Sequence, residues 1–137
     1  MTNWPRDLGI IFAAGCLGGL VNSLALWLLG DLGVTAKVGV NLAPSLSPGW
    51  LYPRIVWGGL WAFLFLFPLP RRSTWLRALI FSLGPSIVQL FVVFPTRPGQ
   101  GLMGFGLGVL TPLFIIFVNA LWGLAAALWL VMSGKRG

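Results

Sequence analysis

The chain has 137 residues, of which 58% are hydrophobic and 8% are charged, and its formal net charge is +7. Soluble domains carry about 25% charged residues, because a surface that faces water needs them. The composition therefore excludes a soluble globular domain and indicates an integral membrane protein with a lipid-solvated surface. At this length we expect a single domain over residues 1–137, with room for about four spans of ~20 residues each.

The positive charge does not indicate nucleic acid. The nine lysines and arginines lie at the ends of apolar segments and do not form a patch on a polar face. Basic residues in such places anchor a protein to lipid headgroups and set its orientation. We therefore expect the lipid bilayer, and no nucleic acid, as a partner. The single cysteine, Cys16, excludes an intrachain disulfide.

The first uncharged run, residues 8–29, is long enough for one span. The connection that follows, residues 30–53, first alternates apolar and polar residues and then becomes rich in proline, serine and glycine. We predict that it lies on the outer membrane surface, extended or as a short turn; a re-entrant loop is the alternative. Its apolar edge would face lipid or a partner and consists of Val34, Val38, Val40 and Leu42.

Three further spans are predicted at about residues 53–69, 75–94 and 108–132. Proline at position 85 removes a backbone donor near the middle of the third span, so we expect a kink there. The glycine-rich residues 101–108 are either the start of a long, tilted helix or a looser segment before it.

The distribution of positive charge predicts the orientation of the spans. A basic hinge, residues 68–77, separates the second span from the third. With the N-terminus inside, six basic residues fall on the cytoplasmic side: Arg6, Arg71, Arg72, Arg77, Lys135 and Arg136. The other side has three: Lys37, Arg54 and Arg97. Positive residues favour the cytoplasmic side, so two hairpins with both ends inside are expected, in a bacterial cytoplasmic or photosynthetic membrane.

Small residues recur four positions apart along the predicted spans, a spacing that lets a neighbouring helix backbone approach closely. The pairs are, in chain order, Gly15 and Gly19, Gly58 and Ala62, Gly104 and Gly108, and Gly123 and Ala127. Such faces pack either inside the bundle or against another protein. Because four spans offer few internal faces, we expect at least one stripe to join a second copy or a different membrane subunit.

A sparse set of polar side chains is predicted inside the spans: Asn22, Ser86, Gln89 and Asn119. An amide in hydrocarbon costs free energy unless it is hydrogen-bonded, so these groups should face one another or a water-filled interior. Interhelical hydrogen bonds are the simpler interpretation. A polar path or ligand pocket is the alternative.

The residue types that most enzymes need are missing. The sequence has no histidine, and its two acidic residues, Asp7 and Asp31, lie at the ends of the first span. A serine or cysteine nucleophile would lack its base, haem its usual axial ligation and a metal ion its ligand set. We therefore expect no enzymatic activity, no catalytic residue, no metal site and no cofactor. Ion-coupled carriers are disfavoured too, because no ionisable group is expected inside a span.

The sequence thus predicts an all-α integral membrane protein of four spans. The leading hypothesis is a small accessory, assembly or stabilising subunit of a larger membrane complex, or a homo-oligomer. The alternative is an oligomeric channel or passive carrier for a neutral or anionic solute. Amides that converge on a cavity would favour transport, whereas amides bonded in dry helix contacts would favour a structural role. A lipid, quinone or pigment in an aromatic groove is a third possibility, which no sequence feature supports.

Overall fold

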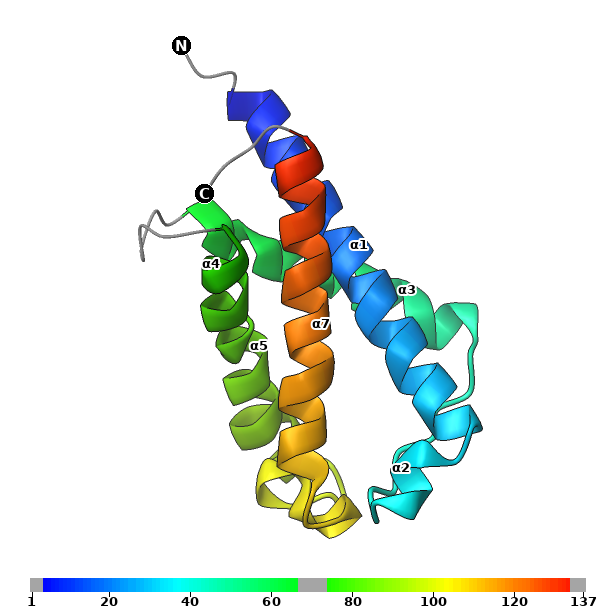
Figure 1. Cartoon of the computed structure of the whole chain (residues 1–137). Coiled ribbons are helices and arrows are strands. Elements are labelled where there is room, and N and C mark those ends of the chain that lie inside the picture. Colours follow the sequence, from blue (N-terminus) through cyan, green and yellow to red (C-terminus); the bar gives the residue numbers. More distant parts are fainter. Residues whose placement is uncertain (1–3, 67–73, 134–137) are drawn as a thin grey trace.

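The computed structural model describes residues 4–66 and 74–133, and these residues form helices and loops without a β-strand (Figure 1). The α-helices are α1 (Trp4–Asp31), α2 (Val34–Lys37), α3 (Pro48–Trp61), α4 (Thr74–Phe81), α5 (Leu83–Val88), α6 (Phe94–Thr96) and α7 (Thr111–Met132). Two 3₁₀ segments, η1 (Ala62–Leu66) and η3 (Leu102–Leu107), and one π-helical segment, η2 (Gln89–Val93), complete the order.

Among the described residues, three helical stretches are long and apolar enough to cross a membrane: Pro5–Asp31, Thr74–Thr96 and Thr111–Met132. The prediction of an all-helical, multi-pass membrane protein is confirmed at this level. The predicted second span corresponds to α3 and η1, of 14 and 5 residues. It is not among the three, so four spans and their orientation remain predictions. The start of α1 and the end of α7 lie at one end of the molecule, and α2 and η3 at the other (Figure 1).

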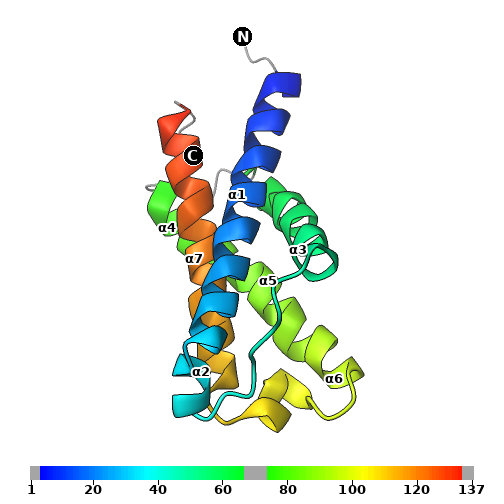
Figure 2. The same cartoon turned by 90° about the vertical axis from the view of Figure 1, so that its right-hand side faces the viewer.

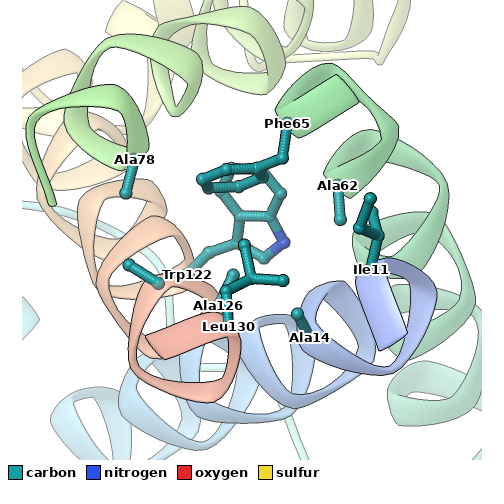
Figure 3. Close-up of a cluster of buried hydrophobic side chains, with 9 residues drawn as sticks. Ile11, Ala14, Ala62, Phe65, Ala78, Trp122, Ala126 and Leu130 are labelled. Carbon is teal, nitrogen blue, oxygen red and sulfur yellow. The ribbon is translucent and has the colours of Figure 1, made fainter. Parts of the chain in front are cut away.

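The centre of the fold is α1, which packs against both α3 and α7, while α4 packs on the other side of α7. Figure 3 shows Trp122 of α7 and Phe65 of η1 at the centre of a buried apolar cluster, with side chains from α1 and α4 around them. The Trp122 indole nitrogen donates a hydrogen bond to the Gly58 carbonyl at 3.2 Å, which ties α7 to α3.

The small residues of α1 and α3 face each other. A Cβ on Gly15 would lie 2.7 Å from the Gly59 Cα and 2.5 Å from the Ala62 Cβ, and a Cβ on Gly58 would lie 2.9 Å from the Gly19 Cα. These backbones therefore approach as closely as only glycine permits, as expected of small-residue packing in membranes.

The other small residues also lie against parts of the same chain. A Cβ on Gly123 would lie 2.6 Å from the Ala78 carbonyl of α4, and Ala127 is fully buried. Gly104 and Gly108 do not share a helix face. Both have positive φ, 73° and 147°, and both lie before α7 begins. The looser of the two structures predicted for residues 101–108 is the observed one, because this backbone conformation is one that glycine adopts readily.

The connection after α1 is predicted to be extended or a short turn, and its first part is a short helix. Gly33, with φ of 81°, ends α1, and Val34–Lys37 forms the short helix α2. Val34 and Val38 are exposed, whereas Val40 is buried. Leu42 packs against a second apolar cluster. The Asn41 amide donates to the Leu107 carbonyl at 2.8 Å, so this connection packs against η3 instead of lying free.

The predicted third span is helical from α4 to α6, with an interruption at Ser82 and a π-helical turn at Gln89–Val93. The Ser82 and Ser86 hydroxyls donate to the carbonyls of Leu79 and Ser82 at 2.7 and 2.9 Å. Serine hydroxyls thus donate hydrogen bonds to two carbonyls in the turns before Pro85, which has no amide hydrogen of its own. A kink at this proline remains a prediction.

Candidate binding pocket

A pocket of about 640 Å³ lies between α3 and α5, and residues of α1 and α7 also line it. Its volume is within the range of about 300–1,000 Å³ that small-molecule sites occupy. Side chains from four helices line it, and most of them are aromatic, aliphatic or amide groups. Its lining residues include Asn22, Trp50, Arg54, Trp57, Trp61, Pro85, Val88, Gln89, Arg97 and Asn119.

The local sequence before α3 determines where Arg54 lies. The Ser47 side chain accepts a hydrogen bond from the Trp50 amide at 3.3 Å, and Pro48 follows at the first helical position. A serine cap followed by proline is a typical helix start. The helix therefore begins at Pro48, and Arg54 is its seventh residue, two turns inside.

The position of α3 against α1 then carries Arg54 away from the end of the bundle. In Figure 2 the chain after α2 runs back along α1 before α3 begins. A Cβ on Gly19 would lie 2.8 Å from the Arg54 carbonyl, so the two helices touch at this level. The Arg54 Nε donates to the Ser23 hydroxyl at 2.8 Å and its Nη2 to the Asn22 Oδ1 at 2.6 Å. Asn22 precedes the last residue of α1, Asp31, by about 13 Å along the helix axis.

The hydrogen bonds continue from Arg54 across the bundle in one direction. Asn22 donates from Nδ2 to the Asn119 Oδ1 at 2.9 Å and to the Val118 carbonyl at 2.8 Å. Asn119 donates to the Ser86 hydroxyl at 3.0 Å, and Ser86 donates to the Ser82 carbonyl. Each acceptor is thus polarised by the donor before it, a cooperative arrangement in a low-dielectric interior. We call Arg54, Asn22, Asn119 and Ser86 the polar chain.

Positive charge is not balanced in the pocket. The described residues that line it include Arg54 and Arg97 but no carboxylate. Both arginines also line an adjoining pocket of about 330 Å³, together with Gln89. The Arg54 guanidinium lies 4.9 Å from the Trp50 ring, a cation–π contact that leaves its charge in place. An anion bound between two like charges offsets the repulsion between them.

The structure brings the predicted polar residues together. Asn22 and Asn119 are each 6% exposed and bonded to each other, and Ser86 bonds to Asn119. Gln89 lies outside the polar chain but lines both pockets. The amides are therefore bonded in helix contacts, which favours a structural role. They also converge on a cavity, which favours transport.

Arg77 lies at the other end of the bundle. It is 1% exposed, donates from Nη2 to the Phe65 carbonyl at 2.7 Å, and has the rings of Phe65 and Phe81 within 5.9 and 5.5 Å. The other residues predicted to set the topology lie outside the described part of the chain: Arg71, Arg72, Lys135 and Arg136.

Sequence analysis missed Arg54, because it counted this arginine as an interfacial residue at the end of a span. The signal that could have found it is the dipeptide Ser47-Pro48, which starts the helix two turns before Arg54. An arginine inside a membrane helix usually marks a functional site. Arg54 is hydrogen-bonded to Asn22 and Ser23 of α1, and Arg77 is buried in the helical stretch Thr74–Thr96.

Comparisons of this chain with protein-family models, with curated proteins and with solved structures find no match.

Proposed function

We propose that this protein is a non-catalytic protein of a bacterial cytoplasmic or photosynthetic membrane that binds an anionic solute in the pocket between α3 and α5. Binding of the solute in this pocket would be the first step of its transport by a passive carrier. The observation that carries the proposal is the guanidinium of Arg54, held by Asn22 and Ser23 at the wall of a cavity that also has Arg97 and no carboxylate among its described lining residues.

The physical argument is the cost of a partly buried cation. Removing a guanidinium from water is expensive unless charge and hydrogen bonds replace its hydration. Asn22 and Ser23 supply hydrogen bonds through neutral oxygens, but they supply no negative charge. A phosphate or carboxylate in the pocket would supply it and would accept the planar, two-pronged hydrogen bonds that arginine forms best.

Binding is tested by titrating octyl phosphate into the protein in phosphatidylcholine nanodiscs and measuring the heat. Empty nanodiscs, titrated in parallel, give the contribution of partitioning into lipid. We expect Arg54→Gln to weaken binding by about tenfold or more, the loss expected for one charge-assisted contact. Lys37→Gln removes the same charge from an exposed position on α2 and should leave binding within about twofold of wild type.

Arg97→Gln is a second test of the site that should not disturb folding, because Arg97 is exposed in the loop after α6. It should also weaken binding while the protein stays monodisperse and helical. Equal affinity of wild type, Arg54→Gln and Arg97→Gln would refute the anion site, and so would an absence of heat from the wild-type protein.

Transport is tested separately by the uptake of radiolabelled octyl phosphate into sealed proteoliposomes. Wild-type protein should accelerate uptake over protein-free liposomes, and Arg54→Gln should remove most of the acceleration. Binding without accelerated uptake would leave a binding protein that does not carry its ligand.

An accessory or assembly subunit is the second candidate function, and one observation favours it. Leu32, Val34 and Val38 at the α2 end are 64%, 40% and 45% exposed, although the connection they begin packs against η3. Apolar side chains exposed at an end of the bundle, beyond the long helices, are available for contact with a protein partner. Mass determination of the intact assembly, extracted from its native membrane in mild detergent, tests this proposal. Other polypeptides in the assembly would support it, and a mass equal to one chain would oppose it.

A further inference from the structure

The pocket changes from charged to apolar along its length. On α3, which forms one wall, Trp50 and Arg54 come first, and Trp57 and Trp61 follow one and two turns later. The segment from α5 to the loop after α6 forms the opposite wall. In this segment the order is reversed: the apolar residues Pro85 and Val88 come first, and Arg97 comes last. Because the two walls are antiparallel, both arginines lie at the α2 end and the apolar side chains lie at the other.

Close helix packing borders the apolar end of the pocket. A Cβ on Gly84 would lie 3.1 Å from the Leu64 Cδ1 and 3.4 Å from the Trp61 Cζ3, so η1 and the end of α3 pack against the start of α5. From Arg54 to Trp61 the distance along α3 is about 10 Å, about the length of an eight-carbon chain. The cavity thus has one charged end and one apolar end at that distance.

The pocket opens at the outer surface of the molecule. Trp57 lines it and is also 62% exposed, so the wall of the cavity reaches the outer surface of the molecule between α3 and α5. If α3 lies in the bilayer beside the long helices, as the prediction of four spans requires, this surface meets acyl chains. A ligand that is dissolved in the membrane can therefore enter without crossing the polar chain.

From these observations we infer that the anionic ligand is an amphiphile with a phosphate or carboxylate headgroup and an alkyl chain. The inference rests on the proposed function and specifies its substrate class. Arg54 and Arg97 bind the headgroup, and the chain lies along Trp57 and Trp61 towards Pro85. Each methylene group that moves into the apolar end contributes to affinity, by about fourfold per group if it is fully buried.

The test compares two phosphate monoesters that differ only in the chain. Methyl phosphate and octyl phosphate are titrated into the protein in phosphatidylcholine nanodiscs, with empty nanodiscs as the reference for partitioning. We expect octyl phosphate to bind at least about tenfold more tightly, because several methylene groups become buried. Octyl glucoside, which has the same chain on a neutral headgroup, should bind at least about tenfold more weakly than octyl phosphate, because it lacks the charge.

Two variants locate the chain. Val88→Phe fills the apolar end from α5, and Trp61→Ala removes an indole from it; Trp129→Ala removes an exposed indole from α7, outside the pocket. Val88→Phe should reduce the preference for octyl over methyl phosphate to about threefold or less, since fewer methylene groups fit. Trp61→Ala should reduce the preference too, and Trp129→Ala should preserve it. The variant Val88→Phe keeps the test valid if Trp61→Ala fails to fold.

The outcomes separate this inference from the proposed function. If methyl and octyl phosphate bind equally and Arg54→Gln weakens both, the anion site stands and the amphiphile is refuted. The source of the headgroup is then a free phosphate and not a lipid. If octyl phosphate binds and Arg54→Gln has no effect, the anion site and the inference both fail. An octyl preference that Val88→Phe leaves unchanged would also refute the inference.

Discussion

The two faces of α3 use opposite kinds of side chain. Towards α1, Gly58, Gly59 and Ala62 leave no room for a further methyl group. Towards α5, Trp57 and Trp61 hold the helices apart around a cavity of about 640 Å³. The comparison shows how a short helix can be fixed rigidly on one side and still provide a binding pocket on the other. Small residues give close van der Waals contact where lipid would otherwise compete, and large residues line a hollow that they do not fill.

The close contact is where substitution should cost most. A Cβ on Gly15 would lie 2.7 Å from the Gly59 Cα, and backbone atoms cannot move as a flexible side chain can. We expect Gly15→Ala to destabilise the protein by about 3 kcal/mol or more, the upper range for overpacking. Thermal unfolding in mild detergent measures it.

Gly9→Ala on the same helix is the matched control, because nothing lies within 4 Å of the Cβ it adds. Alanine favours helix over glycine by about 0.8–1 kcal/mol, so this variant should be at least as stable as wild type. Equal stability of Gly9→Ala and Gly15→Ala would mean that α1 and α3 do not touch as described.

The polar chain joins the close contact to the pocket, and its loss should have the next largest effect. Asn119→Leu removes the acceptor of Asn22 and the donor to Ser86. We expect a loss of about 1–3 kcal/mol, the cost of unsatisfied buried polar groups. Anion binding should also weaken, because Asn22 orients Arg54.

Gln89→Leu is the comparison variant, because Gln89 lines the pocket but lies outside the polar chain. Its unfolding temperature should stay close to that of wild type. An Asn119→Leu protein as stable as Gln89→Leu would show that the amides contribute nothing to the contact between α1 and α7.

Physical reasons explain what the sequence could and could not predict. Hydropathy and length are properties of a segment alone, so the helices around Asn22 and Asn119 were predicted correctly and their amides were expected to meet. The depth of Arg54 is not such a property. It follows from the chain after α2, which passes so close to the end of α1 that a Cβ on Gly30 would lie 2.7 Å from the Ala43 Cα. No count of charges at the ends of spans contains that information.

The same limit applies to the small residues. The spacing of Gly15 and Gly19 correctly indicated a close backbone neighbour, but spacing cannot say whether the neighbour belongs to the same chain. Gly104 and Gly108 have the same spacing and lie in a segment with positive φ, because glycine serves loops as well as helix contacts.

A smaller effect is expected at the bond that fixes α7 to α3. Trp122→Phe retains an aromatic ring in the buried cluster but removes the hydrogen bond to the Gly58 carbonyl. The expected loss is about 1 kcal/mol, the usual net value of one hydrogen bond. Trp129→Phe, at an exposed position on the same helix, should change the unfolding temperature less. The reverse order would place the stabilising indole on the lipid-facing side of α7.

The smallest effect on folding is expected at Val38. A substitution there can therefore test binding to a partner without unfolding the chain. Val38 is 45% exposed, so Val38→Asp should change the stability of the isolated chain by about 0.5 kcal/mol or less. If the α2 end docks onto another subunit, the carboxylate would be buried there without a partner and the complex would dissociate. Ala36→Asp adds the same charge to an exposed neighbour outside the apolar edge and should leave the complex intact. Co-purification from native membranes measures whether each variant stays in the complex. Release by Val38→Asp alone would assign the α2 end to a partner, and retention by both variants would leave the pocket beside α3 as the functional surface of the chain.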